Sequence, residues 1–353
     1  MIEIRLRKIT GAISQKVAQM LKLLSTCCHK HKTRWGVDSE MFTRNKGLLE
    51  TDIFKDASVV FIGLGSAGAS IAFDLARCGV GQFVFIDPDR LDMANLSRHP
   101  SGYLRNIGKF KIDIIGDNIL DINPQAVVYR HKLKVDWDTA ERVRKLVRDS
   151  DIIVLTADSA SVKTVVNKLC IEENIPLLWS GAYRRAAGGQ ILKVIPHQTA
   201  CYECFQTSLS DDGDREISSE RSANAPAYSD VEVEAEPGLG IDISPIATMT
   251  SKLAVQLLLK GKESTLHSLD EDLDCNFYMY FNRREGKAQD FVPMSDHVDG
   301  LRILSWYGVK MPYYDDCICC GNPTVETVLD THSKESQLLQ KQLDFIKRSK
   351  KSE

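Results

Sequence analysis

Short runs of apolar residues alternate with amphipathic stretches from residue 57 onward. Five runs, rich in large and β-branched side chains, have the composition of strands buried on both faces. They cover residues 57–62, 82–86, 126–129, 151–155 and 176–179. Between them, residues 69–78 and 109–121 are expected to form helices. This alternation predicts an α/β fold with a mostly parallel, doubly wound sheet of the Rossmann type.

A long polar segment interrupts the pattern in the second half of the chain. Residues 206–237 are rich in Ser, Asp and Glu and end at Pro237 and Gly238, so we expect a long crossover loop on the surface. After it, residues 246–259 have the pattern of a helix and residues 277–281 that of a strand. A loop of this length inside a compact fold is usually functional or disordered.

The two ends of the chain differ from its middle. Residues 1–35 carry eight Lys and Arg side chains against one acid, a net charge of +7, with apolar residues at helical spacing. We expect residues 1–40 to be a basic helical appendage, with contact to nucleic acid or an anionic surface, or an organelle presequence, as alternatives. Residues 324–353 are expected to be a charged tail, which leaves 41–323 as the main domain.

Overall composition excludes several classes of protein. The chain has 353 residues, of which 43% are hydrophobic and 26% charged, with a net charge of −3. This balance disfavours a dedicated nucleic-acid binder. We find no apolar run of the roughly 20 residues that span a bilayer, and no signal peptide, so we expect no membrane contact and a cytoplasmic location. In a reducing compartment, paired cysteines indicate metal or redox chemistry before disulfides.

A glycine-rich turn follows the first predicted strand and opens a helix. In Gly63-Leu64-Gly65-Ser66-Ala67-Gly68, the first glycine permits a tight turn, the second a close approach to phosphate and the third close packing of helix on strand. Asp87 ends the next strand, where its carboxylate could accept hydrogen bonds from a ribose. These features predict a bound nucleotide and suit NAD as well as ATP.

The residues after Asp87 distinguish these nucleotides. Arg98 can contact phosphate oxygens through two donors, and Lys111 supplies a point charge. A triphosphate needs such cations before a nucleophile can approach, whereas an NAD-dependent oxidoreductase does not. Asp158 follows the strand at 151–155, at the edge of the sheet where ligands bind. It could hold Mg²⁺ or act as the N-cap of a helix beginning near residue 160.

With these motifs the sequence resembles the E1-like adenylating enzymes of the ThiF/MoeB/HesA type. The matching segments are GLGSAG at 63–68, DPD at 87–89, NLSR at 95–98, IGKFK at 107–111 and TAD at 156–158. The resemblance implies that ATP binds through Gly63, Gly65, Gly68, Asp87, Asp89, Asn95, Arg98 and Lys111, and that Asp158 holds Mg²⁺. It further implies a homodimer, in which Arg44 resembles the family arginine that reaches the phosphates of a second subunit.

Two cysteine pairs predict a metal site. Cys201 and Cys204 form one Cys-x-x-Cys, and Cys317 and Cys320 form another, with Cys319 as a spare thiol. Four thiolates suit tetrahedral Zn²⁺ and leave no open position for water, so this zinc would be structural. A redox pair and ordinary buried thiols are the alternatives. Similar paired knuckles occur in many members of the family that the sequence resembles.

The resemblance also implies a reaction. We expect attack by the C-terminal carboxylate of a ubiquitin-like or sulfur-carrier protein, ending in Gly-Gly, on the α-phosphorus of ATP. Some members of the family then form a thioester on a crossover-loop cysteine, but residues 205–274 contain no cysteine here. We therefore expect an acyl-adenylate and no thioester. The alternatives are activation of a peptide or of a modified tRNA base, an NAD-dependent oxidoreductase, and a binding protein without catalysis.

Overall fold

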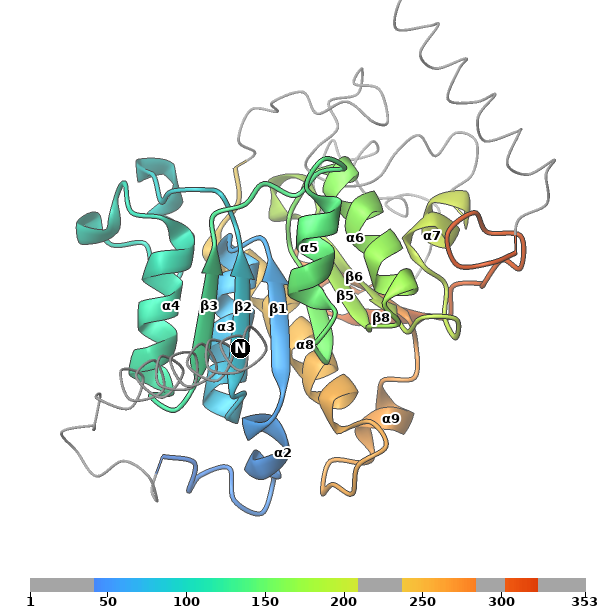
Figure 1. Ribbon diagram of the computed structural model, residues 1–353, viewed down its shortest axis with the longest axis horizontal. Coiled ribbons are helices and arrows are strands. Elements are labelled where there is room, and N and C mark those ends of the chain that lie inside the picture. The colour runs from blue at the N-terminus through green and yellow to red at the C-terminus, as the bar shows by residue number, and fades with distance from the viewer. Residues whose placement is uncertain (1–40, 209–236, 284–301, 323–353) are drawn as a thin grey trace, which may run out of the picture. The chain divides into compact units, whose positions relative to one another are not determined.

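The computed structural model describes residues 41–208, 237–283 and 302–322 (Figure 1). The basic appendage expected at 1–40 and the tail expected at 324–353 lie outside these residues. The chain divides into two compact units, residues 1–44 and 45–353, and the fold below is that of the second unit. Among the described residues, we find no helix with the length and apolar character needed to cross a bilayer.

The centre of the second unit is an eight-stranded sheet in the order β3-β2-β1-β4-β5-β6-β7-β8. The strands are β1 (Ser58–Ile62), β2 (Gln82–Ile86), β3 (Val127–His131), β4 (Ile152–Leu155), β5 (Leu177–Ala182), β6 (Gly188–Val194), β7 (Phe277–Phe281) and β8 (Trp306–Val309). The first five in this order pair in parallel, and β6, β7 and β8 continue the sheet in antiparallel fashion. The predicted α/β fold with a mostly parallel sheet is confirmed.

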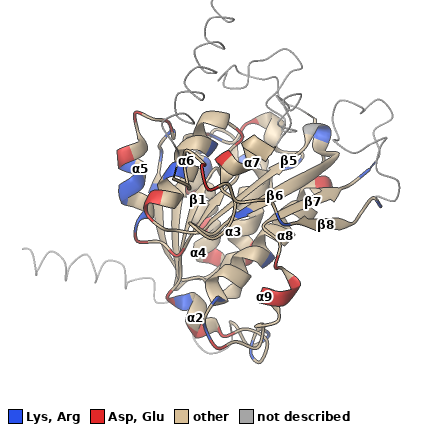
Figure 2. Ribbon diagram, turned by 90° about the vertical axis from the view of Figure 1, so that its right-hand side faces the viewer, with Lys and Arg blue, Asp and Glu red and all other residues tan. Residues whose placement is uncertain are grey.

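Helices cover both faces of this sheet. They are α2 (Thr51–Lys55), α3 (Ser66–Cys78), α4 (Lys111–Ile122), α5 (Ala140–Val147), α6 (Ala160–Glu172), α7 (Tyr202–Ser208), α8 (Gly240–Leu259) and α9 (Leu269–Asp272). One hydrophobic cluster joins α5, α6 and α7 to one face, and a second joins α2, α3, α4, α8 and α9 to the other. The central strands carry few charged residues, whereas Lys, Arg, Asp and Glu lie mainly on helices and at element ends (Figure 2).

The amino-acid pattern explains why the strands are central. All five residues of β1, Ser-Val-Val-Phe-Ile, are buried, because helices cover both sides of the strand. Helix α3 follows and ends at Gly79, whose φ of 98° lies in the left-handed region that glycine adopts without strain. The Gly79 N–H donates to carbonyl oxygens of the last helical turn, so the helix ends here and the chain continues into β2.

Several boundaries differ from the sequence predictions. The expected crossover loop at 206–237 is wrong at its start, because residues 206–208 belong to α7, while 209–236 lie outside the described residues. Helix α8 begins at Gly240 rather than at 246, and Pro245 lies in its interior. The start was predicted too late because Gly240, Asp242, Ser244 and Pro245 interrupt the apolar pattern of a helix. Strands β6 and β8 and helices α2, α5, α7 and α9 were not predicted.

Candidate nucleotide-binding site and cysteine cluster

Three adjacent parallel strands end beside one another and place the chemistry-bearing residues there. The glycine turn 63–68 follows β1, Asp87 follows β2, and Thr156, Ala157 and Asp158 follow β4. Because β1 lies between β2 and β4, all three segments meet at the carboxyl edge of the sheet. Open α/β sheets bind ligands at this edge.

The three glycines of the turn have different roles. Gly63 has a φ of 90°, and a Cβ there would lie 2.7 Å from the Ala157 nitrogen. A Cβ on Gly68 would lie 2.4 Å from the Gly63 carbonyl oxygen, so both positions need glycine for packing. A Cβ on Gly65 would meet no described atom within 4 Å. The position of Gly65 at the N-terminus of α3 is therefore open, and a helix N-terminus favours an anion such as phosphate.

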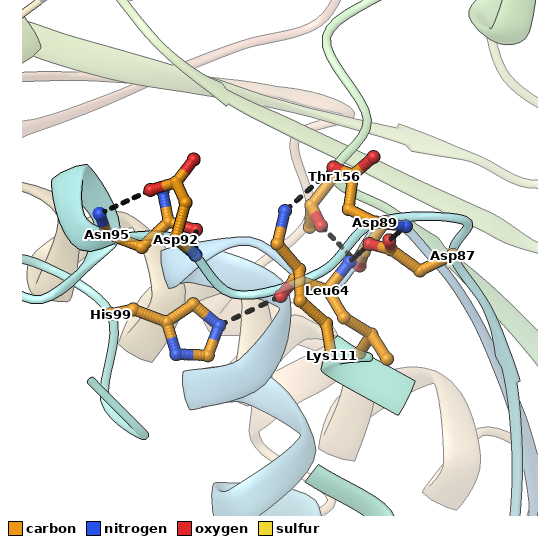
Figure 3. A network of polar contacts seen from close by, with 9 residues as sticks. Leu64, Asp87, Asp89, Asp92, Asn95, His99, Lys111 and Thr156 are labelled. Atoms are coloured by element: carbon orange, nitrogen blue, oxygen red, sulfur yellow. Dashed lines mark hydrogen bonds and ion pairs between the residues drawn. The ribbon is translucent and has the colours of Figure 1, made fainter. Parts of the chain in front are cut away.

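Asp87 is the carboxylate that organises the turn. It is 3% exposed, and its Oδ2 accepts a hydrogen bond from the Leu64 N–H at 2.6 Å (Figure 3). Its Oδ1 accepts from the Asp89 N–H at 2.7 Å. Burial raises the pKa of Asp87, and the positive charge of Lys111 acts against that rise. Each carboxylate oxygen keeps a second lone pair, so Asp87 can also accept a ribose hydroxyl.

His99 holds the next peptide group, through the carbonyl oxygen of Leu64. The buried imidazole bonds the Leu64 carbonyl oxygen through Nε2 at 3.0 Å, and its Nδ1 accepts from the Ser101 N–H at 3.1 Å. These partners fix the neutral tautomer with hydrogen on Nε2, and burial lowers the pKa of His99. Sequence reasoning missed this residue, since a single histidine after Arg98 gives no signal for a contact with Leu64.

Thr156 holds the glycine turn from the neighbouring strand. Its Oγ1 donates to the Gly63 carbonyl oxygen at 2.8 Å, and its N–H donates to the Ile62 carbonyl oxygen at 2.9 Å. The sequence motif TAD included Thr156 without giving it a role. The turn is thus fixed by side chains from three segments, which preorganises its backbone for a ligand.

Lys111 and Asp89 lie beside Asp87 (Figure 3). Lys111 is the first residue of α4, and its Nζ is 2.7 Å from Asp89 Oδ2. The Lys111 side chain is 12% exposed, whereas that of Asp89 is 60% exposed. The Asp89 carboxylate therefore holds the Lys111 ammonium at the site, while the Asp89 side chain itself stays exposed to water. The structure brings both predicted residues together with Asp87.

Asn95 and Arg98 lie on the segment that follows β2. Asn95 and Asp92 form a reciprocal capping box around a short 3-10 helix, Met93–Asn95, in which Asn95 Oδ1 accepts from the Asp92 N–H at 3.3 Å. Arg98 lines a cavity of about 400 Å³ with Ser66 and Ser70 of α3 and Leu239, Ile241 and Ser244 at the start of α8. Arg98 is thus at the wall of a cavity that adjoins the N-termini of α3 and α8.

Two predicted residues are less well defined by the structure. Asp158 is exposed, three residues beyond β4, and next to Ala157, which contacts Gly63. The alternative that Asp158 is the N-cap of α6 is wrong, because the N-cap is Ser159. Arg44 is exposed in a turn at 41–48 and belongs to the first compact unit. Its predicted contact with the phosphates of a second subunit stays a prediction.

The four predicted metal ligands form a buried cluster. The Sγ–Sγ distances are 3.9 Å for Cys201–Cys204, 3.7 Å for Cys201–Cys317 and 3.4 Å for Cys204–Cys320, and all four sulfurs lie within 4.8 Å of one another. With Zn–S bonds of about 2.3 Å, a tetrahedron has sulfurs about 3.8 Å apart. The geometry of these thiols therefore fits a zinc ion.

Asn167, on α6, connects the two arms of this cluster. It is fully buried, its Oδ1 accepts from the Tyr202 N–H at 2.9 Å, and its Nδ2 lies 3.1 Å from Cys319 Sγ. The spare thiol of Cys319 therefore has a partner of its own outside the group of four. The available signal was a polar residue among the apolar residues of α6, but that signal does not identify the distant partners of Asn167.

Comparison with known proteins agrees with this architecture. The model of the ThiF family matches residues 38–290. A region of 183 residues is 29% identical to ubiquitin-like modifier-activating enzyme 5 of Caenorhabditis elegans, covering 48% of this chain and 43% of that protein. A region of 142 residues is 30% identical to tRNA threonylcarbamoyladenosine dehydratase of Bacillus subtilis (strain 168), covering 39% and 55%. These matches thus span about half the length of the relatives.

Solved structures show the same fold. The structure of Escherichia coli MccB with ATP superposes with a TM-score of 0.54 at 23% identity, covering 77% of this chain and 68% of that one. The structure of MccB in complex with N-formylated MccA gives a TM-score of 0.56 at 21% identity, covering 77% and 69%. At this identity the likeness concerns the fold.

Proposed function

The chain belongs to the ThiF family, and from this premise we propose that it is an adenylyltransferase that activates a carboxylate with ATP. The observation that carries the proposal is the cradle around Leu64. Buried Asp87 and His99 fix the N–H and the carbonyl group of Leu64, and so the two successive peptide groups that flank its Cα, beside the open position at Gly65 and the cation of Lys111. This arrangement suits a ribose, a phosphate chain and its charge.

In the proposed reaction each residue has one task. Asp87 accepts the ribose hydroxyls, and the turn from Gly63 to Gly68 receives the α-phosphate at the N-terminus of α3. The phosphates are bound by Asn95, Arg98 and Lys111. Lys111 either breaks its ion pair with Asp89 or keeps that ion pair while it contacts a phosphate. The substrate carboxylate attacks the α-phosphorus, the bond to the β-phosphate oxygen breaks, and pyrophosphate leaves. Catalysis rests on positioning and charge neutralisation.

Two metal ions complete the proposal. Asp158 would hold Mg²⁺, which prefers one or two carboxylates with phosphates and water and would neutralise part of the pyrophosphate charge. Cys201, Cys204, Cys317 and Cys320 would hold Zn²⁺ in a closed structural site. The zinc would tie α7 to the segment after β8, at a distance along the sheet from the glycine turn.

We further propose that the acyl substrate is the C-terminus of a small ubiquitin-like or sulfur-carrier protein. The name of the Caenorhabditis elegans relative supports this class. The names of the other matches support the alternatives, a peptide in the case of MccB with MccA and a modified tRNA base in the case of the dehydratase. Pyrophosphate exchange into ATP distinguishes them, since exchange needs the substrate whose carboxylate is activated.

The experiment has a matched control. Purified full-length chain with Mg²⁺ and ATP should exchange labelled pyrophosphate when a ubiquitin-like protein ending in Gly-Gly is added. The same protein without its last two glycines should give none. Exchange with the truncated protein, or exchange only with tRNA or a short peptide, would contradict the proposed substrate. Binding of NADH without binding of ATP would contradict the proposed nucleotide and favour an oxidoreductase.

The proposal includes a homodimer with Arg44 acting on the neighbouring subunit. Leu239 and Ile241 are 62% and 75% exposed at the cavity that Arg98 lines, and exposed apolar side chains of this size favour a protein contact. Arg44→Ala and Asp87→Ala chains should each be inactive. After co-refolding of equal amounts, the mixture should regain about a quarter of wild-type activity, because about half of the dimers are mixed and one of the two sites in each mixed dimer has all its residues. No recovery would exclude a shared site.

A further inference from the structure

A strained turn lies beside Arg98 at the carboxyl edge of the sheet. The turn joins β5 to β6, and Arg185 and Ala186 within it have φ values of 57° and 50°. Two consecutive residues other than glycine in the left-handed region are unfavourable, so the surrounding structure must hold them there. Such strain is concentrated at functional sites.

Two residues that follow β7 hold this turn. Asn282 donates from Nδ2 to the Ala186 carbonyl oxygen at 2.8 Å. Arg283 donates to the carbonyl oxygens of Arg185 and Ala186, at 2.5 Å and 3.3 Å. The carbonyl groups that the left-handed residues expose are thus satisfied by side chains from a strand end far away in sequence.

The same two side chains hold the first turn of α8. The second hydrogen of Asn282 Nδ2 bonds the Asp242 carbonyl oxygen at 2.8 Å. The Arg283 guanidinium pairs with Asp242 Oδ2 at 2.5 Å, and the Asp242 side chain is only 16% exposed. We call Asn282, Arg283 and Asp242 the clamp, because they join the turn at 183–187 to the start of α8.

The elements that the clamp joins enclose Arg98. A Cβ on Gly238 would lie 3.1 Å from the Ala186 Cβ and 3.9 Å from Arg98 Nη1. Gly238 therefore packs between the turn at 183–187 and the Arg98 guanidinium. A Cβ on Gly240 would lie 3.2 Å from the Arg98 carbonyl oxygen. Movement of either element would therefore change the space available to Arg98.

We propose that the clamp positions Arg98 for the β- and γ-phosphates of ATP, with Arg283 as its central positioning residue. This inference rests on the proposed function, in which Arg98 binds phosphate. Arg283 itself faces the turn and Asp242, so it acts through the backbone at 238–240 that packs on Arg98. Its planar guanidinium bonds an acid and two carbonyl groups at once, which a lysine ammonium matches less well.

The test compares the affinities for ATP and AMP in the full chain. AMP lacks the phosphates assigned to Arg98, so the ratio of the two Kd values reports on the contacts to those phosphates, Arg98 among them, and not on the ribose site. In Arg98→Ala the preference for ATP should fall by about 10-fold or more, since hydrogen bonds between charged groups are the strong ones. Arg283→Ala should lower the same preference by about 3- to 10-fold and leave AMP binding unchanged.

Further variants separate positioning from general stability. The double variant Arg98→Ala/Arg283→Ala should lose no more preference for ATP than Arg98→Ala alone, because Arg283 acts through Arg98. Arg283→Lys should be intermediate. Arg144→Ala is the matched control, since it removes ion pairs to Glu141 on α5 and to Glu172 and Glu173 at the end of α6, and should keep the wild-type ratio. If Arg283→Ala does not fold, Asp242→Asn, which keeps the side-chain size, decides the question.

The outcomes distinguish this inference from the proposed function. If the wild-type chain does not bind ATP, or if Arg98→Ala keeps the preference for ATP, the phosphate assignment fails and the inference fails with it. If Arg98→Ala loses the preference while Arg283→Ala or Asp242→Asn keeps it, the clamp is structural only and the inference alone is overturned. Additive losses in the double variant would likewise overturn it.

Discussion

Two alanine substitutions in one glycine turn should separate an effect on stability from an effect on ligand binding. In Gly68→Ala the new methyl group would lie 2.4 Å from the Gly63 carbonyl oxygen and 2.5 Å from Thr156 Oγ1. These atoms belong to the hydrogen bond that ties the turn to β4, so the turn must move. Overpacking of this kind costs about 1–3 kcal/mol. We expect a loss in this range in the free energy of unfolding.

Gly65→Ala is the matched control for stability. The methyl group would meet no described atom within 4 Å, and the Gly65 φ of −69° and ψ of −164° are accessible to alanine. Loss of glycine at the N-cap and the lower entropy of the unfolded chain nearly cancel, so the free energy of unfolding should change by less than about 1 kcal/mol. The methyl group does, however, fill the space assigned to phosphate, and ATP affinity should fall at least about 10-fold.

Urea unfolding and calorimetric titration with Mg²⁺ and ATP test both expectations on the same two variants. The reasoning would be refuted by a Gly65→Ala chain that binds ATP like the wild type. It would be refuted equally by a Gly68→Ala chain with wild-type stability. The order of the two stabilities matters more than their absolute values, because both substitutions add the same single methyl group.

Three further results are expected. Wild-type protein should contain one zinc ion per chain. Cys201→Ser should lose the zinc and unfold at a lower temperature, whereas Cys319→Ser should keep it. Metal analysis that finds full zinc in Cys201→Ser would contradict the ligand set. Folding lowers the pKa of His99, so the contribution of neutral His99 to stability is present above about pH 6.5 and is lost as the pH falls through the folded pKa. His99→Gln should therefore reduce the fall in the free energy of unfolding with falling pH, measured by urea titrations. The same pH dependence in the variant and the wild type would count against this role of His99. Residues 205–274 contain no cysteine, and burial raises the pKa of Cys275, which disfavours its thiolate. The chain should therefore form no thiol-sensitive adduct with a carrier, and a band on non-reducing gels that Cys275→Ala removes would show otherwise.

Sequence alone predicted the strands whose run of apolar residues is uninterrupted. β2 and β7 begin and end where expected, because every residue in Phe-Val-Phe-Ile of β2 and in β7 is buried and apolar. β6 was missed because it contains two glycines, Gln190 and Lys193 although all of it is buried. The Lys193 ammonium is satisfied by Gln256 Oε1 at 3.0 Å and the Leu273 carbonyl oxygen at 2.6 Å, partners more than 60 positions away.

The residues of the candidate site likewise divide into those that the sequence predicted and those that it did not. The glycine turn, Asp87 and the cysteine pairs were found because their roles depend on local spacing or on residue type. His99, Asn167 and Arg283 were not, because each acts on backbone or sulfur atoms that only the folded chain brings within reach. Sequence reasoning therefore predicted the groups that would touch a ligand better than those that hold them in place.

The cysteine cluster also has a consequence for biosynthesis. Cys317 follows Cys201 by 116 positions, so the ribosome needs roughly 6–23 s, at about 5–20 residues per second, to supply the second pair of thiols. During that interval strands β1 to β6 are already made, while Cys201 and Cys204 await partners. If the cluster holds the proposed zinc, the supply of reductant and metal during translation decides whether each newly made chain closes its cluster or leaves the first pair of thiols open to oxidation.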